Sequence, residues 1–328
     1  APKHQNTKIS MKKVTLLLLF FQAMQHLQAQ QAPLFTVYRD QWSILNPAAV
    51  SNNFLLNNRS MSLSGTWRTQ WWGLSESPRT QLLNWEYVAD EQNSVFGAHA
   101  LNDQTGKIGH TGVYGRFAYR IKSGKRVVQS LTIGLSAGAV QYRARLSEIE
   151  FPDPMTQPLT DDRAIRPDIG VGVFYQYADR YYAGISVPQT FGLSSQFMGG
   201  KEDFDIRRIP HVFAVAGGYW SAPWLGNETS FIEPSVWLKY APNSPLNVDM
   251  NLRCQINELL WAGTGLNTGF GEQFSAALHI EAGMFFGDQV QMLNSQFKVG
   301  FGFDLPVTQS LASIFGASGE VNVVYSWR

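Results

Sequence analysis

The chain has 328 residues, with 26 lysines and arginines against 25 aspartates and glutamates. Residues 1–29 hold four of the lysines and no acid, so the rest of the chain carries 22 − 25 = −3, which gives no reason to expect a nucleic-acid partner. Only 16% of the residues are charged, 13% are aromatic and 29 are glycine, a composition that excludes extended disorder.

Residues 1–29 are typical of upstream sequence followed by a secretory signal peptide. Met11 is followed by two lysines, an apolar run occupies 14–21, and small residues precede a cleavage position near Ala29. The apolar run is far shorter than the roughly 20 residues of a membrane-spanning helix, and no later run reaches that length. We therefore expect an exported chain without a transmembrane helix, and set residues 1–10 apart from the fold.

A segment rich in apolar side chains, residues 30–58, separates the cleavage position from the first expected strand. Its large apolar residues include Phe35, Tyr38, Trp42, Ile44 and Leu45. Because the segment precedes the first strand, we expect it in the periplasm. There it must either pack into the barrel or bind another molecule, and we favour packing at the periplasmic mouth.

Residues 59–328 contain fourteen runs of strand-like alternation, separated by clusters of Gly, Asn, Asp, Pro or Ser. The expected spans are 60–70, 80–89, 93–101, 110–122, 126–142, 168–178, 180–187, 210–220, 228–241, 246–256, 257–267, 272–285, 295–304 and 319–328. Strand ends predicted in this way carry an error of a few residues.

The clearest of these runs is 247–256, in which polar and apolar residues alternate without exception. Successive side chains of a strand point to opposite faces, so one face is apolar and the other polar. The apolar face would carry Val248, Met250, Leu252, Cys254 and Ile256. Ten residues also match the roughly 9–11 of a tilted strand that spans a membrane. The run predicts a strand between lipid and water.

Repetition of this pattern predicts an all-β protein, a transmembrane antiparallel β-barrel of about 14 strands in the outer membrane. Bacterial single-chain barrels have an even number of strands, short periplasmic turns and longer external loops. The two longest connections, 143–167 and 188–209, both follow odd-numbered strands, so both are expected outside the cell. A soluble β-sandwich is the alternative, but a chain of this length would more often divide into domains.

Several short stretches, in their order and spacing, resemble the PorP/SprF family of type IX secretion system outer-membrane proteins of Bacteroidetes. The stretches are Gln31 to Tyr38, Asn46 to Ala48, Arg68 to Gly73, Ser77 to Thr80, Arg166 to Gly170, Tyr181 to Ser186, Glu233 to Ser235, Asp249 to Asn251 and Gly319 to Tyr325. The resemblance covers essentially the whole chain after the signal peptide. The chain departs from the family's usual pattern at Asp40 and Gln41, at Ala49 and Val50, and between Gly316 and Glu320.

The resemblance implies a non-enzymatic barrel, embedded in outer-membrane lipid, that serves type IX secretion and gliding motility. Its implied partners are secreted proteins with a C-terminal sorting domain, such as surface adhesins, and the periplasmic lipoprotein ring of the machine. No cofactor is implied. The alternative function is an outer-membrane channel for small solutes, since a charged, glycine-lined lumen suits either role.

Charged residues on the polar faces of neighbouring strands are expected to pair inside the barrel, since an unpaired buried charge is costly. A tight turn after the ninth run would place Glu233 opposite Arg253. A turn near residue 290 would place Glu281 opposite Lys298. Such a network either braces a closed lumen or lines a path for conduction or a substrate.

The two longest connections carry more apolar side chains than an idle exposed loop needs, and apolar surface patches tend to mark binding sites. The candidate partner-binding residues are Phe151, Met155, Phe191, Phe197, Met198 and Phe204. Either these loops cap the barrel and hold a partner, or they fold inward as a plug.

The spacing of histidine and cysteine residues favours no catalytic or metal site. The histidines after the signal peptide are His99, His110, His211 and His279, and none is spaced from another histidine, or from the single Cys254, as metal ligands are. His279 alternates onto the polar inward face, whereas a lipase-type barrel enzyme needs its histidine on the outside. We therefore expect no enzymatic activity.

Overall fold

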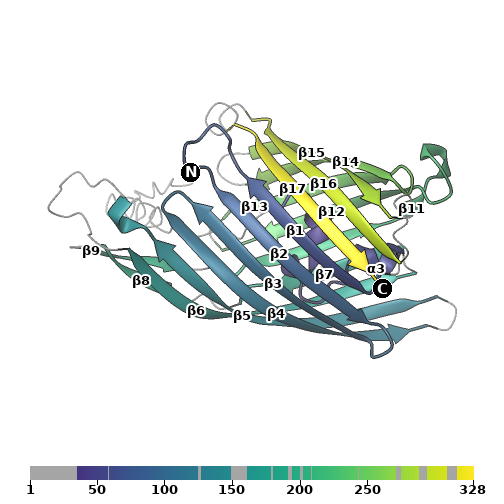
Figure 1. Cartoon of the computed structure of the whole chain (residues 1–328), viewed down its shortest axis with the longest axis horizontal. Coiled ribbons are helices and arrows are strands. Elements are labelled where there is room, and N and C mark those ends of the chain that lie inside the picture. Colours follow the sequence, from purple (N-terminus) through teal and green to yellow (C-terminus); the bar gives the residue numbers. More distant parts are fainter. Residues whose placement is uncertain are drawn as a thin grey trace, which may run out of the picture.

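The structure, a computed structural model, describes most of the chain after residue 34. The described residues are 35–57, 59–124, 127–148, 161–178, 180–190, 194–199, 202–207, 209–242, 244–270, 275–287, 294–308 and 316–328. The predicted signal peptide and its cleavage position near Ala29 lie outside them. Figure 1 shows a single β-barrel of long, tilted strands.

Fourteen antiparallel strands form the wall of the barrel, as predicted. They are β1 (Met61–Thr69), β2 (Arg79–Ala89), β3 (Ser94–Thr105), β4 (Ile108–Ser123), β5 (Gln129–Ala144), β6 (Asp162–Tyr177), β7 (Tyr181–Val187), β10 (Val212–Gly218), β12 (Phe231–Tyr240), β13 (Leu246–Gln255), β14 (Leu260–Phe270), β15 (Ser275–Phe286), β16 (Ser295–Pro306) and β17 (Ser318–Trp327). Each overlaps one of the fourteen predicted runs. Pairing of β1 with β17, and of β10 with β12, closes the barrel.

The remaining elements are short. The helices are η2 (Tyr38–Gln41), α2 (Trp42–Leu45), α3 (Asn52–Asn57), η3 (Leu146–Glu148) and η5 (Pro223–Leu225), and β11 (Trp220–Ser221) extends the edge of β12. Two further strands, β8 (Ser194–Gly199) and β9 (Glu202–Arg207), form a separate hairpin. Within the described part of the chain, every helix is too short or too polar to cross a membrane.

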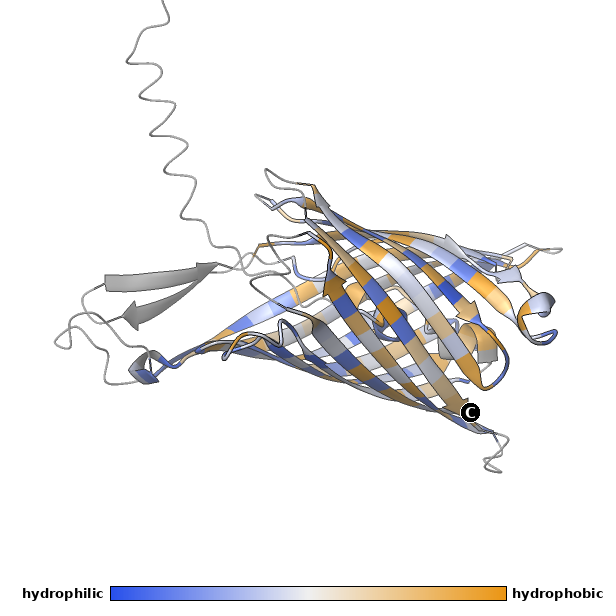
Figure 2. Ribbon diagram, turned by 90° about the horizontal axis from the view of Figure 1, so that it is seen from above, coloured by the Kyte–Doolittle hydropathy of each residue, from blue (hydrophilic) through white to orange (hydrophobic). Residues whose placement is uncertain are grey.

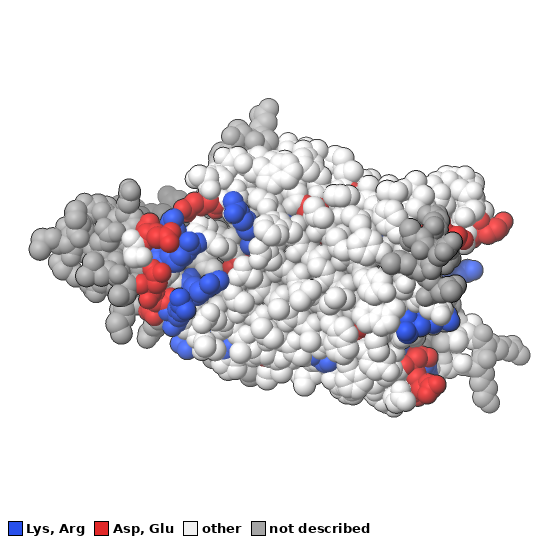
Figure 3. All heavy atoms as spheres, in the orientation of Figure 1, with Lys and Arg blue, Asp and Glu red and all other residues white. Residues whose placement is uncertain are grey.

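The wall has polar side chains inside and apolar side chains outside. In β1, Arg68 is 6% exposed whereas its neighbour Trp67 is 54% exposed. In β13, Asp249 and Asn251 are buried while Met250 faces outward, as the alternation of 247–256 predicts. Hydrophilic and hydrophobic residues alternate along the strands in Figure 2. On the face drawn in Figure 3, the charged side chains gather toward the two ends and leave a nearly uncharged band between them, as an outer-membrane barrel requires.

The strand register confirms one predicted cross-strand pair and contradicts the other. Glu233 of β12 lies opposite Arg253 of β13. Glu281 of β15, however, lies opposite Gly302, and Lys298 of β16 lies opposite Phe285. The expected pair Glu281 and Lys298 was wrong because β15 and β16 pair four residues away from the register that a turn near residue 290 would give. A shift of that size moves every opposing pair along the strand.

The connections differ between the two ends of the barrel. The long connections 145–161 and 188–211 leave the same end, which we name the loop end, and the β8–β9 hairpin belongs to the second of them. The opposite end, named the turn end, carries the short connections 90–93, 178–180 and 256–259. One longer connection at the turn end, 219–230, contains β11 and η5. In outer-membrane barrels short turns are periplasmic and long loops extracellular, so we expect the turn end to face the periplasm.

The N-terminal segment lies inside the barrel rather than at its periplasmic mouth. From Phe35 to Val50, every residue except Asp40 and Ile44 is buried. The segment begins near the loop end, where Thr36 bonds to Asp304 near the end of β16. It reaches the turn end at Val50, which packs with Val88 and Val95 beside the 90–93 turn. Helix α3 then connects it to the start of β1 (Figure 1).

Candidate functional site: the filled lumen and the loop end

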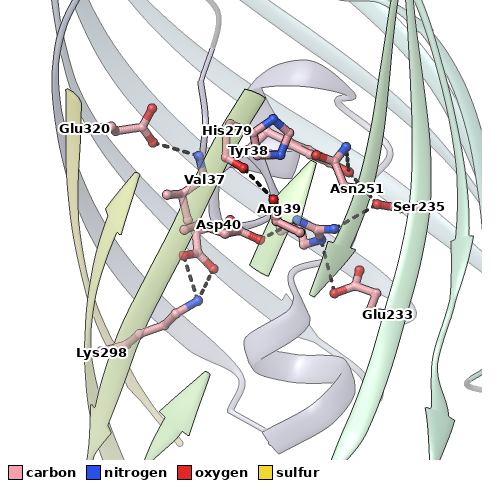
Figure 4. Close-up of polar contacts among 12 residues, drawn as sticks. Val37, Tyr38, Arg39, Asp40, Glu233, Ser235, Asn251, His279, Lys298 and Glu320 are labelled. Carbon is pink, nitrogen blue, oxygen red and sulfur yellow. Dashed lines mark hydrogen bonds and ion pairs between the residues drawn. The ribbon is translucent and has the colours of Figure 1, made fainter. Parts of the chain in front are cut away.

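Arg39 joins the N-terminal segment to two strands of the barrel wall. Its Nε lies 3.2 Å from Glu233 Oε2, and its Nη1 donates to Glu281 Oε1 at 2.8 Å. Its Nη2 donates to the Ser235 hydroxyl at 2.9 Å, and the Tyr182 hydroxyl donates to Glu233 Oε1 at 2.7 Å. These groups are all buried, so the guanidinium supplies the compensation that the two carboxylates would lack without the segment (Figure 4).

A second set of contacts holds the segment to β16 and β17. Lys298 donates to both carboxylate oxygens of Asp40, at 2.6 and 2.7 Å. Glu320 accepts the backbone N–H group of Val37 at 3.1 Å (Figure 4) and that of Thr36 at 2.7 Å. Buried backbone donors need partners, and here a wall carboxylate supplies them where no regular secondary structure does.

The opposite wall binds the later part of the segment through Arg116 of β4. Its Nη1 donates to the carbonyl oxygens of Pro47 at 2.9 Å and Ala49 at 2.8 Å. Its Nη2 pairs with Glu86, whose other oxygen accepts the Ser51 N–H at 2.9 Å. The segment is therefore bonded to both sides of the lumen.

Aromatic packing fills the space between these polar contacts. The Trp42 ring meets Phe174 edge-on at a centroid distance of 5.3 Å and Tyr182 at 5.0 Å. The centroids of the Tyr38 and Trp237 rings lie 4.9 Å apart. Arrangements of this kind are among the preferred geometries of aromatic pairs. Trp42 and Trp237 belong to a buried cluster that joins the segment to the wall.

The middle of the lumen is therefore filled, and cavities remain toward its two ends. Five residues at this level, Val37, Arg39, Gln41, Trp237 and Trp261, are each at most 1% exposed. A cavity of about 200 Å³ opens toward the loop end and is lined by Phe35, Gln70 and Trp71 among others. A second, of about 350 Å³, opens toward the turn end beside Gln255 and Glu258.

The four predicted lumen charges all point inward and are buried, but they do not pair with one another as expected. Glu233 and Glu281 share Arg39, and Lys298 pairs with Asp40. Arg253 lies with its guanidinium 3.9 Å from the centre of the Trp261 ring. The partners are thus supplied by the N-terminal segment, which the sequence analysis treated separately.

The predicted partner-binding residues are placed only in part. Phe151, Met155 and Phe191 lie outside the described residues. Phe197 and Phe204 pair across the β8–β9 hairpin, and Met198 pairs with Asp203. The hairpin lies at the loop end, apart from the barrel sheet.

Sequence reasoning missed the charged residues of the segment and several of their partners. Arg39 and Asp40 sit within the apolar stretch from Phe35 to Leu45, and that position was a usable signal. Two opposite charges inside an apolar segment that is expected to be buried need partners elsewhere in the fold. Arg68 was also missed; it pairs with Asp304 at 2.5 Å and with Glu320 at 3.4 Å.

Outside the membrane-spanning strands, one ionic cluster ties three loop-end connections together. Lys107 lies 2.7 Å from Glu76 and 2.9 Å from Glu148. The hydrogen bonds to Glu76 and then to Glu148 raise the pKa of Lys107 above its usual value. The hydrogen bond from Lys107 lowers the pKa of Glu148. Both groups are largely in water, so the cluster orders the loops more than it stabilises the barrel.

Comparison with solved structures returns outer-membrane barrels at very low sequence identity. Omp33 of Acinetobacter baumannii has 6% identity and a TM-score of 0.43, over 82% of this chain and 98% of that one. The CymD monoaromatic hydrocarbon channel has 9% identity and a TM-score of 0.49, over 90% and 94%. These likenesses say nothing of what this chain binds or transports.

No curated protein matches the sequence. Residues 27–325, however, match the family described as type IX secretion system membrane protein PorP/SprF. This span contains the lumen segment and all fourteen barrel strands except the last two residues of β17. A secretion-system membrane component of this kind is not an enzyme class. The chain therefore belongs to the PorP/SprF family of type IX secretion system membrane proteins, and it is an outer-membrane β-barrel.

Proposed function

We propose that this protein is a non-enzymatic component of the type IX secretion and gliding machinery that binds secreted proteins and anchors them at the cell surface. The bound proteins would carry a C-terminal sorting domain, as surface adhesins of this system do. The periplasmic lipoprotein ring of the machine would contact the turn end. The barrel would then join a surface protein to the machine across the outer membrane.

The observation that carries this proposal is the filled lumen. The N-terminal segment is bonded to β12, β15, β16 and β17 on one side and to β4 on the other. Buried ion pairs of this kind are costly to break from one side only. A barrel whose middle is held shut in this way is suited to binding at its two mouths rather than to conduction of solutes. We infer that the lumen charges Glu233, Glu281 and Lys298 brace the closed state.

The loop end supports the assignment of the binding side. It carries both long connections and the β8–β9 hairpin, in which Phe197, Met198 and Phe204 lie close together along two paired strands. Apolar side chains on an extracellular hairpin suit the docking of another protein. We propose that these three residues, with Phe151, Met155 and Phe191 of the same two connections, contact the secreted partner.

The test is to purify the tagged protein from native outer membranes in mild detergent and to identify its partners by mass spectrometry. Recovery of a secreted protein with a sorting domain, or of the lipoprotein ring, supports the proposal. Recovery of the barrel alone contradicts it.

A triple variant, Phe197→Ser, Met198→Ser and Phe204→Ser, should abolish recovery of the secreted protein while the lipoprotein ring is retained. The matched control changes two polar positions of the same hairpin, Gln196→Ala and Asp203→Ala, and should recover the secreted protein at the wild-type level. Equal recovery of the secreted protein with both variants would show that the hairpin is not part of the binding surface.

A further inference from the structure

The cavity at the turn end is lined by both apolar and charged side chains, and one of the buried charged side chains has no ionic partner among the described residues. Its volume is about 350 Å³, in the range of small-ligand sites. Phe231, Phe285 and Leu56 supply apolar surface, and Arg253 and Lys298 supply positive charge. Because the lining includes residues next to the 256–259 turn, the cavity opens toward the periplasm.

Arg253 differs from the other buried lysines and arginines in the part of the chain that the structure describes. Each of the others forms an ion pair with an aspartate or glutamate: Arg39, Arg68, Arg116, Arg120, Lys239 and Lys298. Within the described ranges, Arg253 forms neither an ion pair nor a hydrogen bond through its side chain, although it is only 5% exposed. A buried charge without a hydrogen-bonding partner is unfavourable, so the site favours the binding of a ligand that supplies a hydrogen-bond acceptor.

Within these ranges Arg253 lacks an ionic partner because the N-terminal segment binds the carboxylate that lies opposite it. Glu233 lies directly opposite Arg253 across the β12–β13 pair, but its carboxylate is bound by Arg39 and Tyr182. The Arg253 guanidinium instead lies over the Trp261 ring at 3.9 Å. Lys298 approaches the same ring at 4.6 Å. Two cations share one indole, and of the two only Lys298 has a carboxylate.

We propose that this cavity binds a carboxylate carried by a polypeptide in the periplasm, with Arg253 as its partner. A guanidinium can hold a carboxylate through two parallel hydrogen bonds, a geometry for which an ammonium is not equivalent. The apolar side chains around Arg253 fit an acidic residue flanked by hydrophobic ones. The site lies at the opposite end of the barrel from the surface proposed for secreted proteins, so it is a second, independent binding site.

The acidic residues of the lining determine which anions fit. Glu233, Asp40 and the exposed Glu258 lie around the same cavity, so a ligand with several negative charges would meet repulsion. A single carboxylate within an apolar sequence fits better than phosphate. Glu258 lines the same cavity as Arg253, so its carboxylate would compete with the ligand for the guanidinium.

The test measures binding to the full-length protein in detergent by isothermal titration calorimetry. The probe is the blocked peptide acetyl-Leu-Asp-Leu-amide, compared with acetyl-Leu-Asn-Leu-amide and with acetate. The aspartate peptide should bind at least tenfold more tightly than either control. Arg253→Gln should remove that difference, and Arg253→Lys should retain part of it.

Glu258→Gln provides a second variant at an exposed position, and it should increase the affinity for the aspartate peptide. Equal binding of the two peptides by the wild type, or no binding of either, overturns the proposal. Undiminished binding by Arg253→Gln does the same. Acetate bound as tightly as the aspartate peptide would make the cavity a site for free carboxylates and would equally overturn a polypeptide ligand.

Discussion

Lys298 and Asp40 form an ion pair in which the ammonium nitrogen lies 2.6 and 2.7 Å from the two carboxylate oxygens. Lys298 belongs to the barrel wall and Asp40 to the segment inside it, and both side chains are at most 5% exposed. The pair thus joins two parts of the chain separated by 258 positions. It also places the segment in register with the wall at the turn end.

Removal of one member of this pair should loosen the segment. Asp40→Asn should lower the free energy of unfolding by about 3–5 kcal/mol, because Lys298 is left buried without its carboxylate. The measurement is urea unfolding in detergent, followed by tryptophan fluorescence. Lys122→Met, which removes an ammonium with 34% exposure from Asp90, is the control and should cost no more than about 1 kcal/mol. Equal losses in the two variants would contradict a special role for the buried pair.

Arg39→Met should be more damaging than Asp40→Asn, because it strands two carboxylates, Glu233 and Glu281. The double variant Arg39→Met with Glu281→Gln should recover part of the lost stability, since it removes one of the two unpaired charges. The same unfolding experiment measures both. A double variant that is less stable than Arg39→Met alone would show that the stranded charge is not the cause.

Enlargement of a wall glycine should displace the segment and open the lumen. A Cβ atom on Gly134 would lie 2.4 Å from the backbone of Pro47 and Ala48, so Gly134→Val cannot be accommodated with the segment in place. Gly115 is the matched control on the neighbouring strand, because a Cβ there meets nothing within 4 Å. In planar bilayers the wild type and Gly115→Val should be silent, and Gly134→Val should conduct. Conductance of the wild type would favour the channel function instead.

The strands could be predicted because their information is local. A period of two with polar residues inward marks each wall strand, and a tight connection fixed the opposition of Glu233 and Arg253. The prediction that Glu281 lies opposite Lys298 depended on the length of a turn. The alternation of polar and apolar residues along a strand does not encode that length. The filling of the lumen was beyond such patterns, since Arg39 and Glu281 are 242 positions apart. The buried Arg39 and Asp40 signalled a need for partners without identifying them.

Acidification should release the loop-end cluster around Lys107. The hydrogen bond from Lys107 holds the pKa of Glu148 below its usual value. The contribution of this carboxylate to the stability of the cluster is therefore complete above a pH of about 4.5, the ordinary pKa of a glutamate. It is lost as the pH falls through the lowered pKa. A spin label at Ser75→Cys, in a Cys254→Ala background, should gain mobility over that acidic range. In Lys107→Met the label should be mobile at every pH, and a pH-dependent change that persists in this variant would assign the transition to other groups.

The path of the segment predicts on which side of the membrane the chain that precedes Phe35 emerges. Phe35 lines the cavity that opens toward the loop end, and the chain then descends to Val50 beside the 90–93 turn. The loop end is extracellular if the short turns are periplasmic. An epitope inserted after Gln31 should therefore bind antibody on intact cells, whereas the same epitope after Arg328, which follows β17 at the turn end, should bind only after the outer membrane is permeabilised. Antibody access to the C-terminal epitope alone would reverse the orientation assigned to the barrel, and access to neither would place the N-terminus in the periplasm.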